Sequence, residues 1–286
     1  MTGSGWRIFD DPVRFLEAVG PMDLEQEAMN RLPLAICRRL SESPTHDEKA
    51  FLYLAREGRV ITGAAVRMPG RNIVLLSGPR WGHVDCLMLR DALISAGVDL
   101  PGVFGPFEPA RSFSAVWCDL METVPVIRMQ LGAYILVEVR LAPGPGALVQ
   151  ATSSDADFFW EWEKAFSIDC YGELQPHFTR EAAERLLASG EVFFWVIDGE
   201  KVSMASSNRT TERGAVVYLV YTPPALRGRG YASSVVAALT KRQLDSGLSY
   251  CTLFADIANP VSNSIYQRIG YEFSGRFTEI AFENGV

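Results

Sequence analysis

Proline and glycine alternate in the segment Ala142-Pro143-Gly144-Pro145-Gly146, and this break most constrains how the chain can fold. Neither residue type continues a helix or a central strand, so the segment predicts a boundary between two domains. A chain of 286 residues is long enough for two domains of ordinary size. We therefore predict one domain over residues 1–142 and another over residues 147–286.

The second half has a legible order of helices and strands. Asp198-Gly199 separates two strand-like segments and predicts a hairpin between them. Apolar spacing and helix stop signals define the other elements. The order is helices at 157–166 and 179–188, strands at 192–197, 202–209 and 215–221, a helix at 230–244, a strand at 252–255, a helix at 260–269 and a strand at 271–282.

The first half repeats nearly the same order. Moving Pro109 onto Pro260, a shift of 151 positions, carries one half onto the other. We interpret this as a tandem duplication of one α/β unit with a mixed sheet flanked by helices; a single doubly wound domain would need longer βα alternation. The first-half elements are strands at 50–56, 60–67 and 73–76, a helix at 84–96, a short strand at Val103, a helix at 109–120 and strands at 124–129 and 134–139.

Composition excludes several classes of function. A net charge of −7 argues against nucleic acid or an anionic membrane as the main partner. No apolar segment approaches the roughly 18 residues of a membrane span. The five cysteines are scattered and never form a CxxC pair, and the three histidines lack metal-ligand spacing. These features predict a cytoplasmic protein without a metal.

An apolar strand at 215–221 leads into Pro223 and Pro224 and then into Arg227-Gly228-Arg229-Gly230-Tyr231-Ala232. Proline cannot continue the hydrogen-bond ladder of a central strand, so backbone groups near Val220, Tyr221 and Thr222 are left for a ligand. The two glycines permit a tight loop before a helix N-terminus, which favours a diphosphate. A P-loop and a Rossmann fingerprint match less well, because Tyr231 and Ser233 stand where those motifs need other residues.

A second motif follows in the order strand, capped helix and turn. Asn259 and Pro260 are good residues for the start of a helix. Asn263 and Tyr266 lie on adjacent turns of that helix, on roughly one face.

Together the two motifs resemble the GNAT superfamily of acyl-CoA N-acyltransferases. The segment 227–232 satisfies the family's Arg/Gln-x-x-Gly-x-Gly/Ala pyrophosphate signature. The segment Asn259-Pro260-Val261-Ser262-Asn263-Ser264-Ile265-Tyr266 matches its later helix, which ends here in Gly270-Tyr271. The resemblance covers about residue 147 to the C-terminus, and the whole is similar to tandem GNAT proteins.

The first half departs from this pattern. Its loop Ser77-Gly78-Pro79-Arg80-Trp81-Gly82-His83 lacks the glycine spacing, and at the same shift Ala115 replaces Tyr266 and Glu108 replaces Asn259. We expect 1–142 to be a degenerate copy without a cofactor site.

The resemblance implies direct attack of an amine on the thioester of acetyl-CoA. Val220, Tyr221 and Thr222 would hold the pantetheine arm and polarise the acyl carbonyl. Tyr266 would protonate the departing thiolate. The pyrophosphate would lie on Arg227, Gly228, Arg229, Gly230, Tyr231 and Ala232, and Asn259 and Asn263 would contact the pantetheine or order a water.

The base that deprotonates the amine is less clearly marked. Strand 215–221 carries no Asp or Glu. Glu173 is the first candidate because its loop borders the acceptor site in the family that the sequence resembles. His177, Asp256 and bulk water remain alternatives.

The leading function is an N-acetyltransferase that acts on a small-molecule, amino-acid or peptide amine. Two alternatives stay open. One is a glycine N-acyltransferase type of enzyme that uses longer acyl-CoA. The other is a non-catalytic acyl-CoA sensor. Neither the acceptor nor the oligomeric state follows from the sequence.

Overall fold

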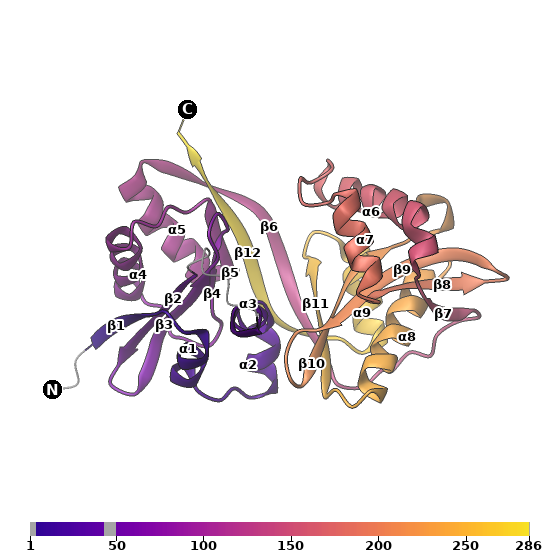
Figure 1. Ribbon diagram of the computed structural model, residues 1–286, viewed down its shortest axis with the longest axis horizontal. Coiled ribbons are helices and arrows are strands. Elements are labelled where there is room, and N and C mark those ends of the chain that lie inside the picture. The colour runs from indigo at the N-terminus through magenta and orange to yellow at the C-terminus, as the bar shows by residue number, and fades with distance from the viewer. Residues whose placement is uncertain (1–3, 43–49, 286) are drawn as a thin grey trace. The chain divides into compact units, whose positions relative to one another are not determined.

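The computed structural model describes residues 4–42 and 50–285, and the chain forms two compact units. The first unit contains residues up to 133 together with 255–258 and the segment from 274 onward. The second unit contains residues 134–254 and 259–273. Each unit follows one half of the sequence, except that the C-terminal strand belongs to the first unit. Figure 1 gives the labels of the elements used below.

The first unit is a mixed sheet with helices on both faces (Figure 1). Its strand order is β1-β2-β3-β4-β5-β12-β6, in which β4 and β5 are parallel and β5 and β12 antiparallel. Its elements are β1 (Ser4–Phe9), α1 (Pro12–Val19), α2 (Leu24–Met29), α3 (Arg31–Glu42), β2 (Phe51–Glu57), β3 (Val60–Arg67), β4 (Ile73–Leu75), α4 (His83–Ser95), β5 (Gly102–Pro106), α5 (Phe107–Met121), β6 (Thr123–Leu136) and β12 (Glu272–Asn284).

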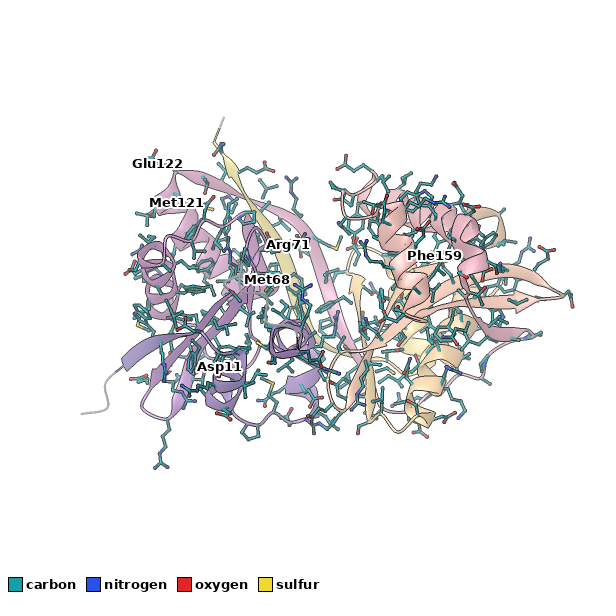
Figure 2. All side chains as sticks on the ribbon, viewed as in Figure 1. Asp11, Met68, Arg71, Met121, Glu122 and Phe159 are labelled. Carbon is teal, nitrogen blue, oxygen red and sulfur yellow. The ribbon has the colours of Figure 1, made fainter. Side chains whose placement is uncertain are left out.

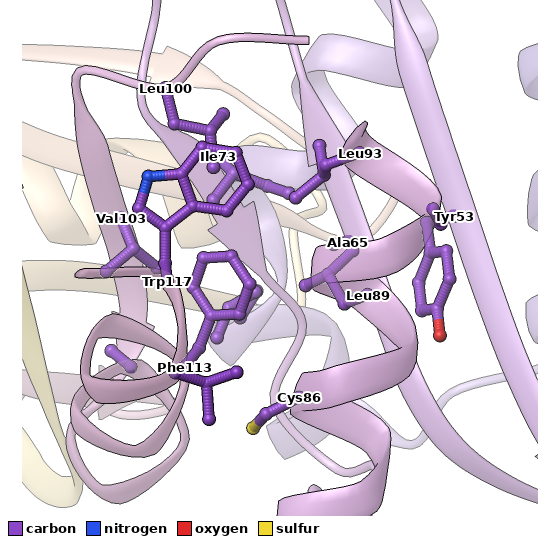
Figure 3. Packing of buried hydrophobic residues seen from close by; sticks show 14 of the residues in the cluster. Tyr53, Ala65, Ile73, Cys86, Leu89, Leu93, Leu100, Val103, Phe113 and Trp117 are labelled. Carbon is purple, nitrogen blue, oxygen red and sulfur yellow. The ribbon is translucent and has the colours of Figure 1, made fainter. Parts of the chain in front are cut away.

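Alternation along β2 divides the core of this unit between the two faces of the sheet. Tyr53 packs with α4 and α5, whereas Leu52 and Leu54 pack with α1 and α3. Figure 3 shows the first cluster, in which Phe113 and Trp117 of α5 lie against the strands. The Asp11 side chain, labelled in Figure 2, caps α1 by accepting from the amides of residues 13 and 14.

The second unit is also a sheet between two layers of helices. Its strands run in the order β6-β11-β10-β9-β8-β7, where β6 contributes its last residues and β10 and β11 are parallel. Helices α6 and α7 cover one face, and α8 and α9 lie on the other (Figure 1). The elements are β7 (Ala147–Gln150), η1 (Ser153–Asp155), α6 (Ala156–Tyr171), α7 (Arg180–Ala188), β8 (Val192–Ile197), β9 (Glu200–Arg209), β10 (Gly214–Tyr221), η2 (Pro224–Leu226), α8 (Tyr231–Asp245), β11 (Tyr250–Asp256) and α9 (Pro260–Ile269).

The proline-glycine break is fixed to the second unit. The amide of Gly144 donates to Ser234 Oγ at 3.0 Å, and the Trp195 indole donates to the Pro145 carbonyl at 3.2 Å. Gly146 adopts a φ of +129°, and a Cβ there would meet Trp195 Nε1 at 2.6 Å. The segment is therefore an ordered part of the second unit, and the assignment of functions to 1–142 and 147–286 stays a prediction.

The predicted mixed α/β fold class is confirmed. Strands β1 and β7 were not predicted, and two further strands differ from the prediction. The two strands expected at 124–129 and 134–139 form one strand, β6. The last strand, expected to serve the second half, pairs with β5, and Ile280 lies opposite Val103.

Candidate functional site

A bulge interrupts β10 just before its end. Tyr218 lies opposite Ser206 and Tyr221 opposite Met204, so β10 has one residue more than β9 over this stretch. Leu219 carries the distortion with a φ of +54°, although its side chain is only 8% exposed. The pairing of β10 with the parallel strand β11 covers Gly214 to Val216. A bulge of this kind redirects the backbone, here over the residues predicted to hold the pantetheine arm, Val220, Tyr221 and Thr222.

Side chains hold this redirected end in place. Ser203 of β9, fully buried, donates to the Tyr221 carbonyl at 3.0 Å and lies 2.9 Å from Thr222 Oγ1. The Nε atom of Arg227 donates to the Thr222 carbonyl at 2.9 Å. The segment from Tyr221 to Arg227 is therefore cross-linked at both ends, as a site preorganised for a ligand requires.

The N-terminus of α8 is open to an anion. Gly228 and Gly230 have φ values of +77° and +80°, a left-handed conformation that glycine adopts without strain. Gly230 caps the helix, no side chain accepts from its first amides, and its first turn, which begins at Tyr231 and Ala232, contains no acidic residue. Free amides and the positive end of the helix dipole attract phosphate groups.

The two arginines of this loop are both exposed, and they differ in their contacts. Arg227 forms an ion pair with Asp169 of α6, and its guanidinium carbon lies 5.9 Å from the centre of the Tyr221 ring. Arg229 makes a long contact of 3.4 Å with the Ala225 carbonyl. Arg227 must leave a carboxylate before it can bind a diphosphate, whereas Arg229 has only a weak contact to give up.

Two predicted residues of α9 are engaged within the second unit. Asn259 caps the helix, and its Oδ1 accepts from the Ser262 amide at 3.1 Å. The Oδ1 atom of Asn263 accepts from the Tyr134 hydroxyl at 3.1 Å. Asn259 thus has the structural role that its sequence context predicts, and Tyr134 is a neighbour of the predicted site that sequence reasoning missed.

Tyr266 is buried, with 8% of its surface exposed. Burial, and in second place the neighbouring Cys170 thiol of α6, raise the pKa of the Tyr266 hydroxyl above its usual value. The phenol is therefore protonated near neutral pH and able to donate a proton. Its ring lies 6.4 Å from that of Tyr134 and 6.1 Å, edge-on, from that of Tyr271.

The predicted base candidates lie in different settings. Glu173 is exposed in the turn after α6, where its backbone carbonyl accepts from Ser167 Oγ at 3.0 Å. The ring of His177, also exposed, packs 4.5 Å from that of Phe178. Asp256 accepts from the Ala258 amide at 2.9 Å and so fastens the turn before α9.

Sequence reasoning also missed Glu163, on the inner face of α6. The side chain is 4% exposed, and burial raises its pKa to about 7. The spacing 159, 163, 166 and 170 places it with Phe159, the residue labelled in Figure 2, on one face of the helix. That spacing was readable in the sequence, but the surrounding aromatic residues concealed it.

Residues 4–42 and 50–285 contain neither a candidate metal site nor a candidate membrane-spanning helix. They contain no group of three or more His, Cys, Asp or Glu side chains arranged to hold a metal ion. In the same ranges, no helix combines the length and the apolar character needed to cross a membrane.

Part of the second unit is similar to one family of known proteins. Residues 156–271 match the model of the acetyltransferase (GNAT) family. The N-alpha-acetyltransferase MAK3 of Arabidopsis thaliana is 36% identical over 73 residues, which are 26% of this chain and 38% of that protein. The chain therefore spans well under half of this curated relative.

Solved structures show the same fold over nearly the whole chain. A GNAT-family acetyltransferase from Colwellia psychrerythraea superposes with a TM-score of 0.56 at 14% identity, over 98% of this chain and 100% of that one. A tandem GNAT protein from the clavulanic acid biosynthesis pathway gives a TM-score of 0.56 at 12% identity, over 99% of each chain. The predicted arrangement of two GNAT-like folds is confirmed.

Proposed function

We propose that the chain transfers an acetyl group from acetyl-CoA to a primary amine, because residues 156–271 match the model of the acetyltransferase (GNAT) family. The observation that carries the proposal is the N-terminus of α8, which follows Gly228 and Gly230, has no side-chain cap and comes after the bulged end of β10. The acceptor is a small molecule, an amino acid or a peptide. The similarity to an N-alpha-acetyltransferase supports an amino terminus among these.

The donor site would use the loop and the bulge together. The pyrophosphate lies on the amides of residues 228–232 at the start of α8, with Arg227 and Arg229 adding charge-assisted hydrogen bonds. The backbone of Val220 to Thr222 pairs with the pantetheine arm and polarises the thioester carbonyl. Asn263 of α9 and the hydroxyl of Tyr134 of β6, which are hydrogen-bonded to each other, orient the arm or a water.

The reaction would proceed without a covalent enzyme intermediate. The neutral amine attacks the carbonyl carbon, the new C–N bond forms and the C–S bond breaks. Tyr266 donates its proton to the leaving thiolate and regains one from the amide nitrogen. The amine is an ammonium ion before it attacks, so a base must accept its proton. The sequence predicts Glu173 for this role.

We place the cofactor site in the second unit alone. In the first unit, Asp85 accepts from the Gly82 amide at 2.8 Å, so a carboxylate occupies the start of α4. A carboxylate there repels a diphosphate. The start of α8 carries no such group.

An amine panel tests this proposal. The purified chain is incubated with acetyl-, hexanoyl- or benzoyl-CoA and with small amines, amino acids and peptides, and free thiol is measured. We expect amine-dependent thiol release with acetyl-CoA and weaker release with the longer donors. Binding of coenzyme A without thiol release above hydrolysis for any amine would favour the sensor, and preference for long donors would favour the glycine N-acyltransferase type.

A further inference from the structure

One buried carboxylate in the second unit has an oxygen atom without a hydrogen-bond partner in the described part of the chain. Glu163 is 4% exposed, and its Oε2 atom has no hydrogen-bond partner among the described residues. A buried polar atom left in this state costs about 1–3 kcal/mol. The apolar cluster around α6, which includes Phe159 and Phe194, could have accepted a leucine at this position. Because stability alone would favour an apolar residue there, we infer that the carboxylate of Glu163 serves the function of the protein.

Helix α6 packs against β10, and Tyr218 of that strand belongs to a network rich in hydrogen-bond acceptors. The Tyr218 hydroxyl donates to Glu191 Oε2 at 2.6 Å, and Asn208 Nδ2 donates to the same oxygen at 3.0 Å. The charge of Glu163 also acts on Tyr218 and is among the causes that raise its pKa, after burial and Glu191. Asn208 Oδ1 and Ser206 Oγ are buried without partners in the described part of the chain. We call these five residues the acidic cluster.

Cations on the neighbouring elements are engaged with other carboxylates. Helix α6 packs against α7, β10 and η1. On β10 the titratable groups are Tyr218 and Tyr221, and on α7 Glu181 interacts with Arg185. The remaining ion pairs around the helix are Arg180 with Asp157 and Glu184, Lys201 with Asp155, Lys164 with Glu161, and Arg227 with Asp169.

Two features connect the acidic cluster with the proposed reaction centre along the chain. Tyr218 directly precedes the bulged residue Leu219. Glu163 shares its helix face with Cys170, and the Cys170 thiol lies near enough to Tyr266 to affect its pKa. Seven residues of helix separate Glu163 from Cys170, which is about 10 Å along the axis.

We propose that Glu163 is the proton acceptor for the amine, reached through water along the inner face of α6. The proposal rests on the proposed function and replaces Glu173 in that role. The acceptor ammonium gives one proton through water to the Glu163 carboxylate, and its nitrogen lone pair then attacks the thioester. The acid form of Glu163 returns this proton to solvent after the amide product has formed, so each turnover releases one proton and one thiol.

Electrostatics agree with the geometry. Burial raises the pKa of Glu163 to about 7, so the carboxylate exchanges a proton readily near neutral pH. A proton acceptor works best when its pKa lies near the operating pH. The carboxylate of Glu191 already accepts two hydrogen bonds, so it is less available than Glu163 to accept a proton.

The test compares Glu163→Gln with Glu173→Gln and with a matched control, Glu161→Gln, an exposed residue of the same helix. Steady-state rates are measured with the best amine of the panel from about pH 6 to about pH 9.5. We expect Glu163→Gln to lose about 10²-fold in kcat near neutral pH, with an unchanged KM for acetyl-CoA. The loss should shrink as the pH rises, because solvent then deprotonates the amine. Glu163→Asp should recover part of the rate.

The outcomes separate the two proposals. A wild-type chain without thiol release overturns the proposed function and this inference with it. An active wild type with an unchanged pH profile in Glu163→Gln overturns this inference alone. So does a loss of the same factor at every pH, which indicates a structural role, or a loss confined to Glu173→Gln. Binding of coenzyme A and the melting temperature verify that each variant is folded.

Discussion

The guanidinium of Arg227 is paired with the carboxylate of Asp169, on the C-terminal part of α6. Arg227 is also the first residue of the loop 227–232 that is proposed to bind the diphosphate of acetyl-CoA. The carboxylate of Asp169 therefore competes with that diphosphate for the guanidinium of Arg227. Both side chains are about half exposed. Exposed pairs of this kind contribute roughly 0–1 kcal/mol. The competition is therefore weak enough for a bound diphosphate to overcome.

Replacing Asp169 by Asn should strengthen coenzyme A binding. The free guanidinium no longer has to leave a partner, and up to about 1 kcal/mol corresponds to a gain of up to about fivefold. Titration calorimetry measures the affinity, and Asp157→Asn, which removes one of the two carboxylate partners of Arg180, is the control. Weaker binding in Asp169→Asn would show instead that the carboxylate positions Arg227 for the donor.

Tyr266→Phe should abolish most of the turnover and leave the fold intact. The phenylalanine ring keeps the contacts with Tyr134 and Tyr271, whereas the proton donor is lost. General acid catalysis contributes about 10²–10⁴-fold, so kcat should fall by that order with little change in coenzyme A affinity. Thiol release and calorimetry check the two parts. A kcat within about twofold of the wild type would remove Tyr266 from the mechanism.

Gly230→Ala should weaken donor binding more than its effect on stability explains. Open space surrounds the position, so the cost comes from the φ of +80°, about 1–2 kcal/mol. Relief of that strain would displace the amides that start α8. Gly199→Ala is a close control, because Gly199 has a φ of +85°, open surroundings and a place in the β8–β9 turn. Thermal unfolding should drop similarly in both variants, and coenzyme A affinity only in the first; equal affinities would contradict the assignment of the loop.

The stability of the unligated chain should depend on Glu163 between about pH 4.5 and about pH 7. The folded state raises this pKa above its unfolded value, so the native chain binds the extra proton and stability falls as the pH rises through this window. A rise from 4.5 to about 7 corresponds to at most about 3 kcal/mol. Denaturant unfolding of wild type and Glu163→Gln should show a widening advantage for the variant over this range. A constant difference would contradict the assigned pKa.

Local signals in the sequence account for the elements that were predicted correctly. The hairpin at Asp198-Gly199 forms with φ values of +49° and +85°, and Asn259 caps α9 as its position before Pro260 suggests. The elements at 60–67, 192–197 and 260–269 match the predicted bounds. Each of these has its stop signal within a few residues.

The parts that were not predicted depend on distant residues. Leucine avoids positive φ, so no local signal predicts the bulge at Leu219. Tyr218, Leu219 and Tyr221 all pack in one cluster with residues of α6 and α7, which are distant in the sequence. Glu163 becomes conspicuous only when Tyr218 and Glu191 are seen near it. The place of β12 in the first unit depends on its pairing with β5, where Ile280 lies opposite Val103, 177 positions earlier in the sequence.

The pairing of β12 with β5 makes the fold of the first unit depend on the last strand of the chain. Residues 277–281 complete the sheet of the first unit by pairing with β5, although they are encoded at the far end of the chain. Deleting the first half would leave this strand with an unpaired edge, and ending the chain early would take a strand from the first half. If the first half has no cofactor site, as predicted, it would still be needed to pair with the last strand of the chain.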